Sequence, residues 1–114
     1  MKARSFRIRL LDIREEIGGI RALVRDVTAE TFAANWAMKR AVQHALLIIA
    51  EAAKHIPADA KEAHPEVPWR QIHGLGNLLR HEYQRIDSDV LWLVVTEHID
   101  SLDEAVAAML NRLL

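Results

Sequence analysis

Apolar residues recur every three or four positions along most of this chain. This period is typical of amphipathic α-helices, and no stretch alternates as a half-buried strand would. Four main helices are therefore predicted, at residues 5–26, 29–55, 68–85 and 89–113, with a short helical turn at 58–64. The pattern predicts an all-α fold, an up-and-down bundle of four main helices plus a short helix.

Capping and breaking residues mark the ends of these helices. Thr28 separates the first two helices, and Pro57 ends the second. Pro68 begins the third, since proline is favoured in the first helical turn. Ser88 is predicted to cap the fourth. The chain shows no internal repeat or low-complexity linker, so residues 1–114 are predicted to form a single domain.

Two local features of the apolar pattern lead to expectations about packing. Gly18 and Gly19 lie inside the first predicted helix, where each glycine costs about 1 kcal/mol relative to alanine. A kink or a close helix–helix contact at these glycines is expected, in preference to a break. The tryptophans Trp36, Trp69 and Trp92 occupy positions typical of the core and are interpreted as packing residues.

Composition narrows the class of protein. The chain has 114 residues, 51% of them hydrophobic, and no cysteine, which excludes disulfides and thiolate zinc sites and favours the cytoplasm. No signal peptide or membrane-spanning segment is recognised. The net charge is −1, yet residues 1–25 are basic and residues 86–114 acidic. Either these segments form helix surfaces that face and attract each other, or the basic end helps to hold a polyanion. A protein that binds nucleic acid through its overall charge is usually much more basic, so any contact with RNA must be local.

Polar side chains follow one flank of the predicted helix at 68–85. Histidine exchanges a proton near neutral pH, and arginine binds phosphate. A base and a cation suffice to cleave RNA without a metal, because the base takes the 2′-hydroxyl proton and the cation stabilises the transition state. The alternative is an ordinary solvated helix flank. The residues, at spacings of three and four, are Arg70, His73, Asn77, Arg80, His81 and Gln84.

Spacing gives little support to a metal site. His73, Asn77 and His81 are four residues apart, but zinc would need further ligands, and the chain has neither an HExxH motif nor a cysteine pair. No metal or other cofactor is therefore expected. Tyr83, the only tyrosine, is interpreted as a half-buried aromatic with its hydroxyl at the rim. It should point about 200° away from His81 unless the helix ends there.

Four sequence blocks, in this order, resemble the HepT-like branch of the HEPN superfamily. The resemblance covers essentially the whole chain and implies a helical, dimeric ribonuclease acting as the toxin of a type II toxin–antitoxin system. The implied partners are RNA and an antitoxin, a minimal nucleotidyltransferase. The blocks are Phe32, Ile-Ala-Glu-Ala-Ala-Lys at 49–54, His-Pro-Glu-Val-Pro-Trp-Arg at 64–70 and Gly-Leu-Gly-Asn-Leu-Leu-Arg-His-Glu-Tyr at 74–83.

The family signature is arginine, a polar residue, three or four others, histidine, any residue and tyrosine. By this resemblance Asn77 is the polar residue, His81 the catalytic histidine and Tyr83 the tyrosine to which the antitoxin attaches AMP. The signature arginine should occupy position 76, where this chain has Gly76. The chain therefore departs from the signature at one position.

The missing arginine leaves three hypotheses. In the first, the protein is an active ribonuclease whose catalytic cation comes from Arg80, one turn beyond position 76, from Arg70 or from an arginine of a second protomer. Arg70 and His73 are expected to bind substrate. Alternatively the protein is a non-catalytic module that keeps its dimer and binds the antitoxin or nucleic acid without cleaving. A purely structural bundle is the third hypothesis. Losing a cation aimed at the transition state typically costs about 100- to 1,000-fold in rate.

Overall fold

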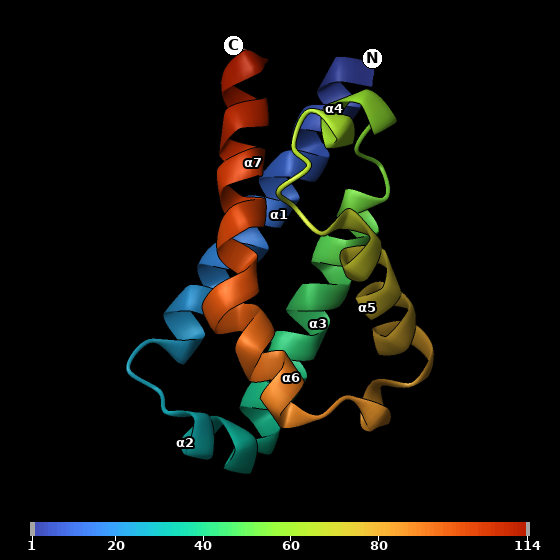
Figure 1. Ribbon diagram of the computed structural model, residues 1–114. Helices are drawn as coiled ribbons and strands as arrows, with labels where there is room; N and C mark the ends of the chain where they lie inside the picture. Colours follow the sequence, from blue (N-terminus) through green and yellow to red (C-terminus); the bar gives the residue numbers. More distant parts are fainter. Residues whose placement is uncertain (1, 114) are drawn as a thin grey trace.

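A computed structural model describes residues 2–113 of the chain, with side chains from residue 5 onward. These residues form helices and no strand, which confirms the predicted all-α fold (Figure 1). The long helical stretches run alternately down and up, and both ends of the chain lie at the same end of the bundle. The elements are α1 Lys2–Val24, α2 Ala29–Ala34, α3 Trp36–Ala53, α4 Ala58–Glu62, α5 Trp69–His81, a 3₁₀ turn Tyr83–Arg85, α6 Ser88–Leu93, a π-helical segment Val94–His98 and α7 Ile99–Arg112.

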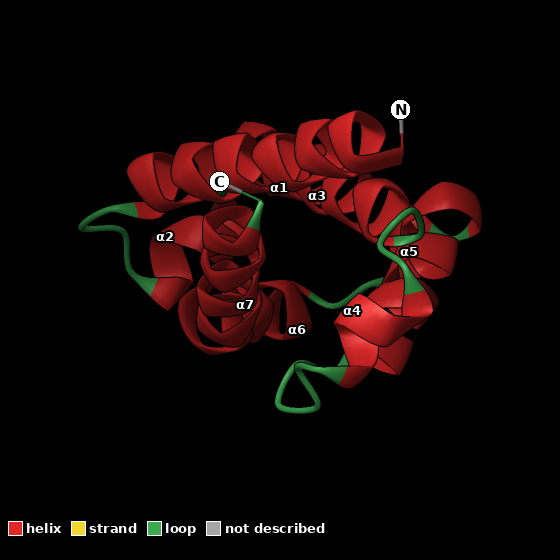
Figure 2. Cartoon of the chain, turned by 90° about the horizontal axis from the view of Figure 1, so that it is seen from above, coloured by secondary structure: helices red, strands yellow, loops and turns green. Residues whose placement is uncertain are grey.

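Helix α3 lies between α1 and α5, and α7 packs against α1 (Figure 2). The side chains that the 3.6-residue period places on one face of each helix form a continuous core. Helix α5 packs chiefly on α3, so a long flank of α5 is left available for other contacts. Fully buried members of the core include Leu10, Ile13, Ile17 and Ile20 of α1, Val42 of α3, and Leu91 and Val106 of the last stretch.

The second predicted helix is in fact two helices, and the prediction of one helix at 29–55 is wrong. Thr28 caps α2, accepting a hydrogen bond from the amide of Thr31 at 3.1 Å. Asn35 then adopts an extended conformation, and its side chain accepts a bond from the amide of Met38 at 2.9 Å. Asparagine is a strong N-cap residue, so it starts a new helix although the apolar period continues through it.

The glycine pair in α1 has no packing role. No heavy atom outside the local helix lies within 4 Å of a Cβ built on Gly18 or Gly19, so the expected close helix contact is wrong. The helix continues through both residues without a break, as expected. It ends at Val24, and Asp26 in the turn that follows has a φ of 60°, the left-handed conformation that is common just after a helix.

Two of the three tryptophans pack as predicted. Trp92 lies against Phe32, with 5.2 Å between ring centroids, and joins α6 to α2. The indole nitrogen of Trp69 donates to the carbonyls of Lys61 and His64, both at 3.1 Å, and so ties the connector after α4 to α5. Trp36 is 68% exposed, so its interpretation as a core residue is wrong. Because a new helix starts at Asn35, this residue is turned to the surface.

The last helical stretch differs from the prediction at two places. Asp87, not Ser88, precedes the first helical residue, and no side chain caps the helix there. The α-helix is also interrupted by the π-helical segment, where the hydroxyl of Thr96 donates to the carbonyl of Trp92 at 2.7 Å. Insertions of this kind are frequent at functional sites and change the helical phase of the residues that follow.

Ion pairs join the first and the last helix of the chain. The guanidinium of Arg21 on α1 contacts Asp103 and Asp100 on α7, each at 2.6 Å. These carboxylates raise the pKa of Arg21. The first interpretation of the uneven charge, two helix faces that attract each other, is confirmed. None of the helices within residues 2–113 is long and apolar enough to cross a bilayer.

Candidate active site

The predicted catalytic histidine lies at the end of α5. The helix ends at His81, because Glu82 leaves the helical region with φ −143° and ψ 39°, and a 3₁₀ turn begins at Tyr83. The predicted extension of the helix to residue 85 is therefore wrong. Tyr83 was expected either to point away from His81 on the same helix or to lie past the end of the helix, and the second placement is confirmed. His81 and Asn77, one turn earlier, are both exposed.

Arg80 is positioned by an acidic partner on α3. Its guanidinium is ion-paired with the carboxylate of Glu51, and the ammonium of Lys54 lies 3.4 Å from the same carboxylate oxygen. Two cations thus share one anion, and the cluster keeps one unbalanced positive charge. This ion pair holds the Arg80 side chain toward α3, so a bound phosphate would have to compete with Glu51 for the guanidinium.

His73 has a different environment from His81. Its Nε2 lies 3.0 Å from the ammonium of Lys61, at the end of α4, and its Nδ1 is buried without a hydrogen-bond partner in the described part of the chain. Burial lowers the pKa of His73, and the charges of Lys61 and Lys54 lower it further. Neutral His73 therefore accepts a hydrogen bond from Lys61. Its role in substrate binding, and that of exposed Arg70, stay predictions.

The lowered pKa of His73 predicts how stability changes with pH. The unfolded chain takes up this proton near the ordinary value of 6.5, before the folded protein does. The free energy of unfolding, measured by urea titration, should therefore fall as the pH drops from 7.5 through 6.5 and level off below the folded pKa. His73→Gln should reduce this loss most, and Lys61→Met less, because burial is the larger cause. Equal losses in wild type and His73→Gln would contradict the assignment.

Position 76 faces α3. Gly76 is buried, and a Cβ built on it would lie 2.7 Å from the Cβ of Ala50, closer than real Cβ contacts. Glycine here lets α5 approach α3, which offsets its poor helix propensity. A longer side chain at position 76 would therefore meet α3 before it reached solvent.

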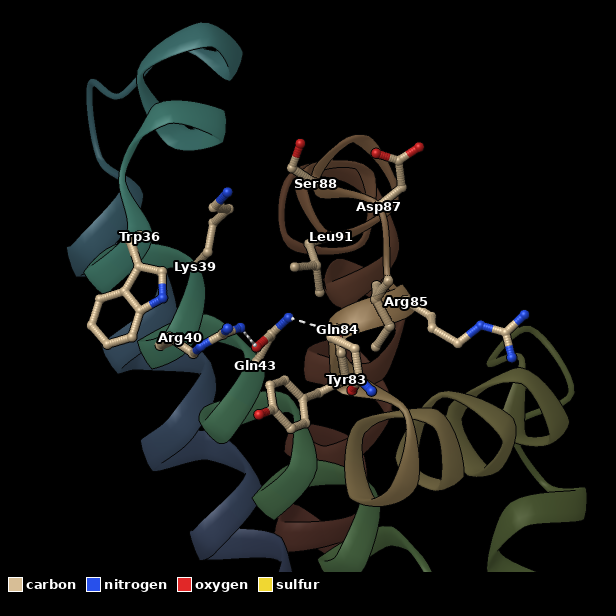
Figure 3. A pocket seen from close by; sticks show the side chains of 11 residues that line it. Trp36, Lys39, Arg40, Gln43, Tyr83, Gln84, Arg85, Asp87, Ser88 and Leu91 are labelled. Atoms are coloured by element: carbon tan, nitrogen blue, oxygen red, sulfur yellow. Dashed lines mark hydrogen bonds between the residues drawn. The ribbon is translucent and has the colours of Figure 1, made fainter.

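A polar hollow of about 500 Å³ opens beside Tyr83 (Figure 3). The guanidinium carbon of Arg40 lies 4.8 Å from the ring centroid of Tyr83 and 5.5 Å from that of Trp36. Arg40 donates to the side-chain oxygen of Gln43 at 2.9 Å, and the Gln43 amide donates to the carbonyl of Tyr83 at 3.3 Å. These contacts join the first two turns of α3 to the turn that follows His81.

The α3 residues of this hollow are not among the candidate binding residues predicted from the sequence. Their pattern could have indicated them, because an aromatic, two cations and an amide follow one another at helical spacing. The interpretation of Trp36 as a core residue obscured that pattern. The residues are Trp36, Lys39, Arg40 and Gln43.

Groups that could hold a metal ion do not cluster around His81. No three His, Asp or Glu side chains gather at one place within the residues whose side chains are described. His73, the other imidazole of α5, is directed to Lys61. The end of α5 therefore places His81 and Asn77 in solvent with the cations Arg80 and Lys54 on the side of α3, and their part in catalysis stays a prediction.

Comparison with known proteins identifies the family of the chain. Residues 13–109 match the family "Ribonuclease HepT-like". A protein of Thermococcus cleftensis named "Probable ribonuclease HepT" is 42% identical over 99 residues, which cover 87% of this chain and 90% of that protein. A Methanocaldococcus jannaschii protein named as a candidate RNase is 35% identical over 106 residues, 93% of this chain and 97% of its own. No solved structure gives a significant match.

The all-α bundle and the family match together place the chain in the HEPN-type class that the sequence resembles. The chain belongs to the HepT-like ribonuclease family. This confirms the resemblance and the prediction that the protein is an enzyme of the ribonuclease class.

Proposed function

We propose that the protein is a metal-independent endoribonuclease and the toxin of a type II toxin–antitoxin pair. The observation that carries this proposal is the placement of His81, exposed at the end of α5 directly after the exposed Arg80. A base next to a cation, open to solvent, meets the needs of RNA cleavage through the 2′-hydroxyl. The family of the chain supports the same substrate.

The reaction follows from these groups. His81 takes the proton of the 2′-hydroxyl, the 2′-oxygen bonds to phosphorus, and the bond from phosphorus to the 5′-oxygen breaks. The products are a 2′,3′-cyclic phosphate and a 5′-hydroxyl, whose proton comes from an imidazolium or from water. Arg80, with the extra charge of Lys54, stabilises the phosphorane-like transition state, and Asn77 orients His81 or the substrate.

Purified protein incubated with single-stranded RNA in EDTA tests this function. We expect fragments ending in a cyclic phosphate, and no cleavage of the same oligonucleotide with 2′-O-methyl groups, since it lacks the nucleophile. Intact RNA after long incubation at high protein concentration would overturn the proposal.

The proposed enzyme is a homodimer whose second copy docks on an apolar groove beside α5. The groove, about 620 Å³, is lined mainly by apolar residues of α3, α5 and the last helical stretch, with Gln71 and His98 as its polar members. Leu78 and Val90 on its walls are 43% and 49% exposed, although burial would favour both. Leu78 lies one turn before His81, so a second copy seated here would bring its own active site close. The family resemblance argues for a copy of the same chain as the occupant.

Charge placed in this groove should separate the protomers. Leu78→Glu should raise the dimer dissociation constant at least 100-fold, because burying an unpaired carboxylate costs several kcal/mol. Sedimentation velocity over a concentration series measures the change. Leu11→Glu on α1 is the matched control, because Leu11 is similarly exposed, at 44%, and lies outside the groove. Equal effects of the two substitutions, or a monomeric wild type, would contradict the docking site.

The proposed antitoxin is a minimal nucleotidyltransferase that attaches AMP to Tyr83. Support comes from the resemblance and from the position of Tyr83, exposed two residues after His81. AMP on this hydroxyl would place a bulky anion at the mouth of the active site. Mass spectrometry of the protein co-expressed with such an enzyme tests the modification, with Tyr83→Phe as the control.

One observation favours the second candidate, a catalytically degenerate dimer that binds its partner or nucleic acid without cleaving. Gly76 is buried against Ala50, and Arg80 is already paired with Glu51, so no described arginine near His81 on α5 is free of a carboxylate. This candidate predicts RNA binding without fragments in the assay above.

A further inference from the structure

The hollow beside Tyr83 has features that cleavage at His81 does not use. Trp36 is the most exposed large hydrophobic side chain among the described residues. It stands on the first turn of α3, and Figure 3 shows its indole at the edge of the hollow. Tryptophan is normally covered, so an aromatic face left open to solvent indicates a planar partner that binds there.

Arg40 is held in place between two aromatic rings. Its guanidinium contacts both Trp36 and Tyr83, and it donates to Gln43, which is itself buried. A guanidinium has five N–H donors, and the hydrogen bonds found within the described residues use one of them. Arg40 is therefore preorganised, with donors left for an anion.

The charge of the hollow is positive at the α3 wall. No carboxylate among the described side chains lies within 4 Å of Lys39 or Arg40. Arg85 is paired with Glu82 at 2.8 Å and extends away from the hollow (Figure 3). Asp87 lines the opposite side of the hollow, so its positive charge is local to the α3 wall, where two unneutralised cations lie beside an exposed indole.

We propose that this hollow is a subsite for one nucleotide of single-stranded RNA next to the cleaved bond. The base stacks on Trp36, and Lys39 and Arg40 bind its phosphate. Aromatic stacking beside basic groups is the usual means of holding single strands, and only an unpaired base can expose its face. Two peptide steps separate Tyr83 from His81, so their Cα atoms are at most about 8 Å apart. The role of the subsite in cleavage rests on the proposed ribonuclease function, but binding of RNA to it can be measured without cleavage.

Binding of a fluorescent, single-stranded 2′-O-methyl oligoribonucleotide, followed by anisotropy, tests the subsite. Trp36→Ala should weaken binding about 5- to 150-fold, the range for one stacked base, with the salt dependence unchanged. The matched variant Trp36→Phe keeps an aromatic face and should stay within about threefold of wild type. Lys39→Ala should reduce the slope of log affinity against log salt by about 0.7, the value for one phosphate contact on a single strand.

A duplex of the same sequence separates stacking from general effects. Its affinity should not change in Trp36→Ala, because paired bases cannot stack on the indole. The subsite is overturned if the wild type does not bind the single strand, if Trp36→Ala binds it as the wild type does, or if this variant weakens both forms equally. Cleavage by the wild type with no effect of Trp36→Ala would sink the subsite alone. Trp36-dependent binding without any cleavage would support the subsite and overturn the ribonuclease function.

Discussion

Replacing His81 with alanine should lower the rate of RNA cleavage by about 100- to 10,000-fold, the usual contribution of a general acid or base. His73, the other imidazole of α5, is directed to Lys61 on the side of α4. Initial rates on a labelled single-stranded RNA in EDTA, with enzyme in excess, measure the change. Because His81 is exposed, its loss should change the free energy of unfolding by no more than about 0.5 kcal/mol.

The matched control is His55→Ala, which removes an equally exposed imidazole just beyond the end of α3. This variant should cleave at the wild-type rate. Added imidazole should restore part of the activity of His81→Ala and none of the activity of a variant that has lost its fold. Wild-type cleavage by His81→Ala would show that the reaction is carried out elsewhere or by a contaminant.

The sequence was sufficient for the helices because their signal is periodic and local. The apolar period in α1, Leu10 to Ile20, matches the side chains that are buried. Helix ends were less predictable, because a single cap decides them. Asn35 begins a new helix within an apolar pattern that does not change, and this one cap turned Trp36 from an expected core residue into a surface residue.

For the active site, the sequence predicts which residues of α5 are exposed but not which residues of other helices contact them. The exposed positions of Asn77 and His81 follow from helical spacing. Glu51 beside Arg80 and Lys61 beside His73 come from other helices, at positions that only packing determines. Arg80 and His73 therefore differ in a way that spacing could not show, since Arg80 is paired with Glu51 on α3 while His73 is directed to α4.

Gly76→Arg, which would introduce the residue expected from the family signature, should instead lower the free energy of unfolding by at least about 3 kcal/mol. A Cβ at this position already lies 2.7 Å from that of Ala50, and overpacking of a core costs about 1–3 kcal/mol before a guanidinium is forced between two helices. Urea unfolding measures the loss, and the melting temperature should drop by about 10 °C or more.

Gly74→Ala is the matched control, because a Cβ on Gly74 meets nothing within 4 Å. It should raise stability by up to about 1 kcal/mol through helix propensity alone. Gly76→Ala should be less stable than Gly74→Ala, and adding Ala50→Gly should recover part of the difference, as expected for residues in contact. If Gly76→Ala proves as stable as Gly74→Ala, the close approach of α5 to α3 is wrong. If the approach holds, activity lost in Gly76→Arg reports damage to packing, and the source of the catalytic cation must be sought at Arg80 or across the dimer.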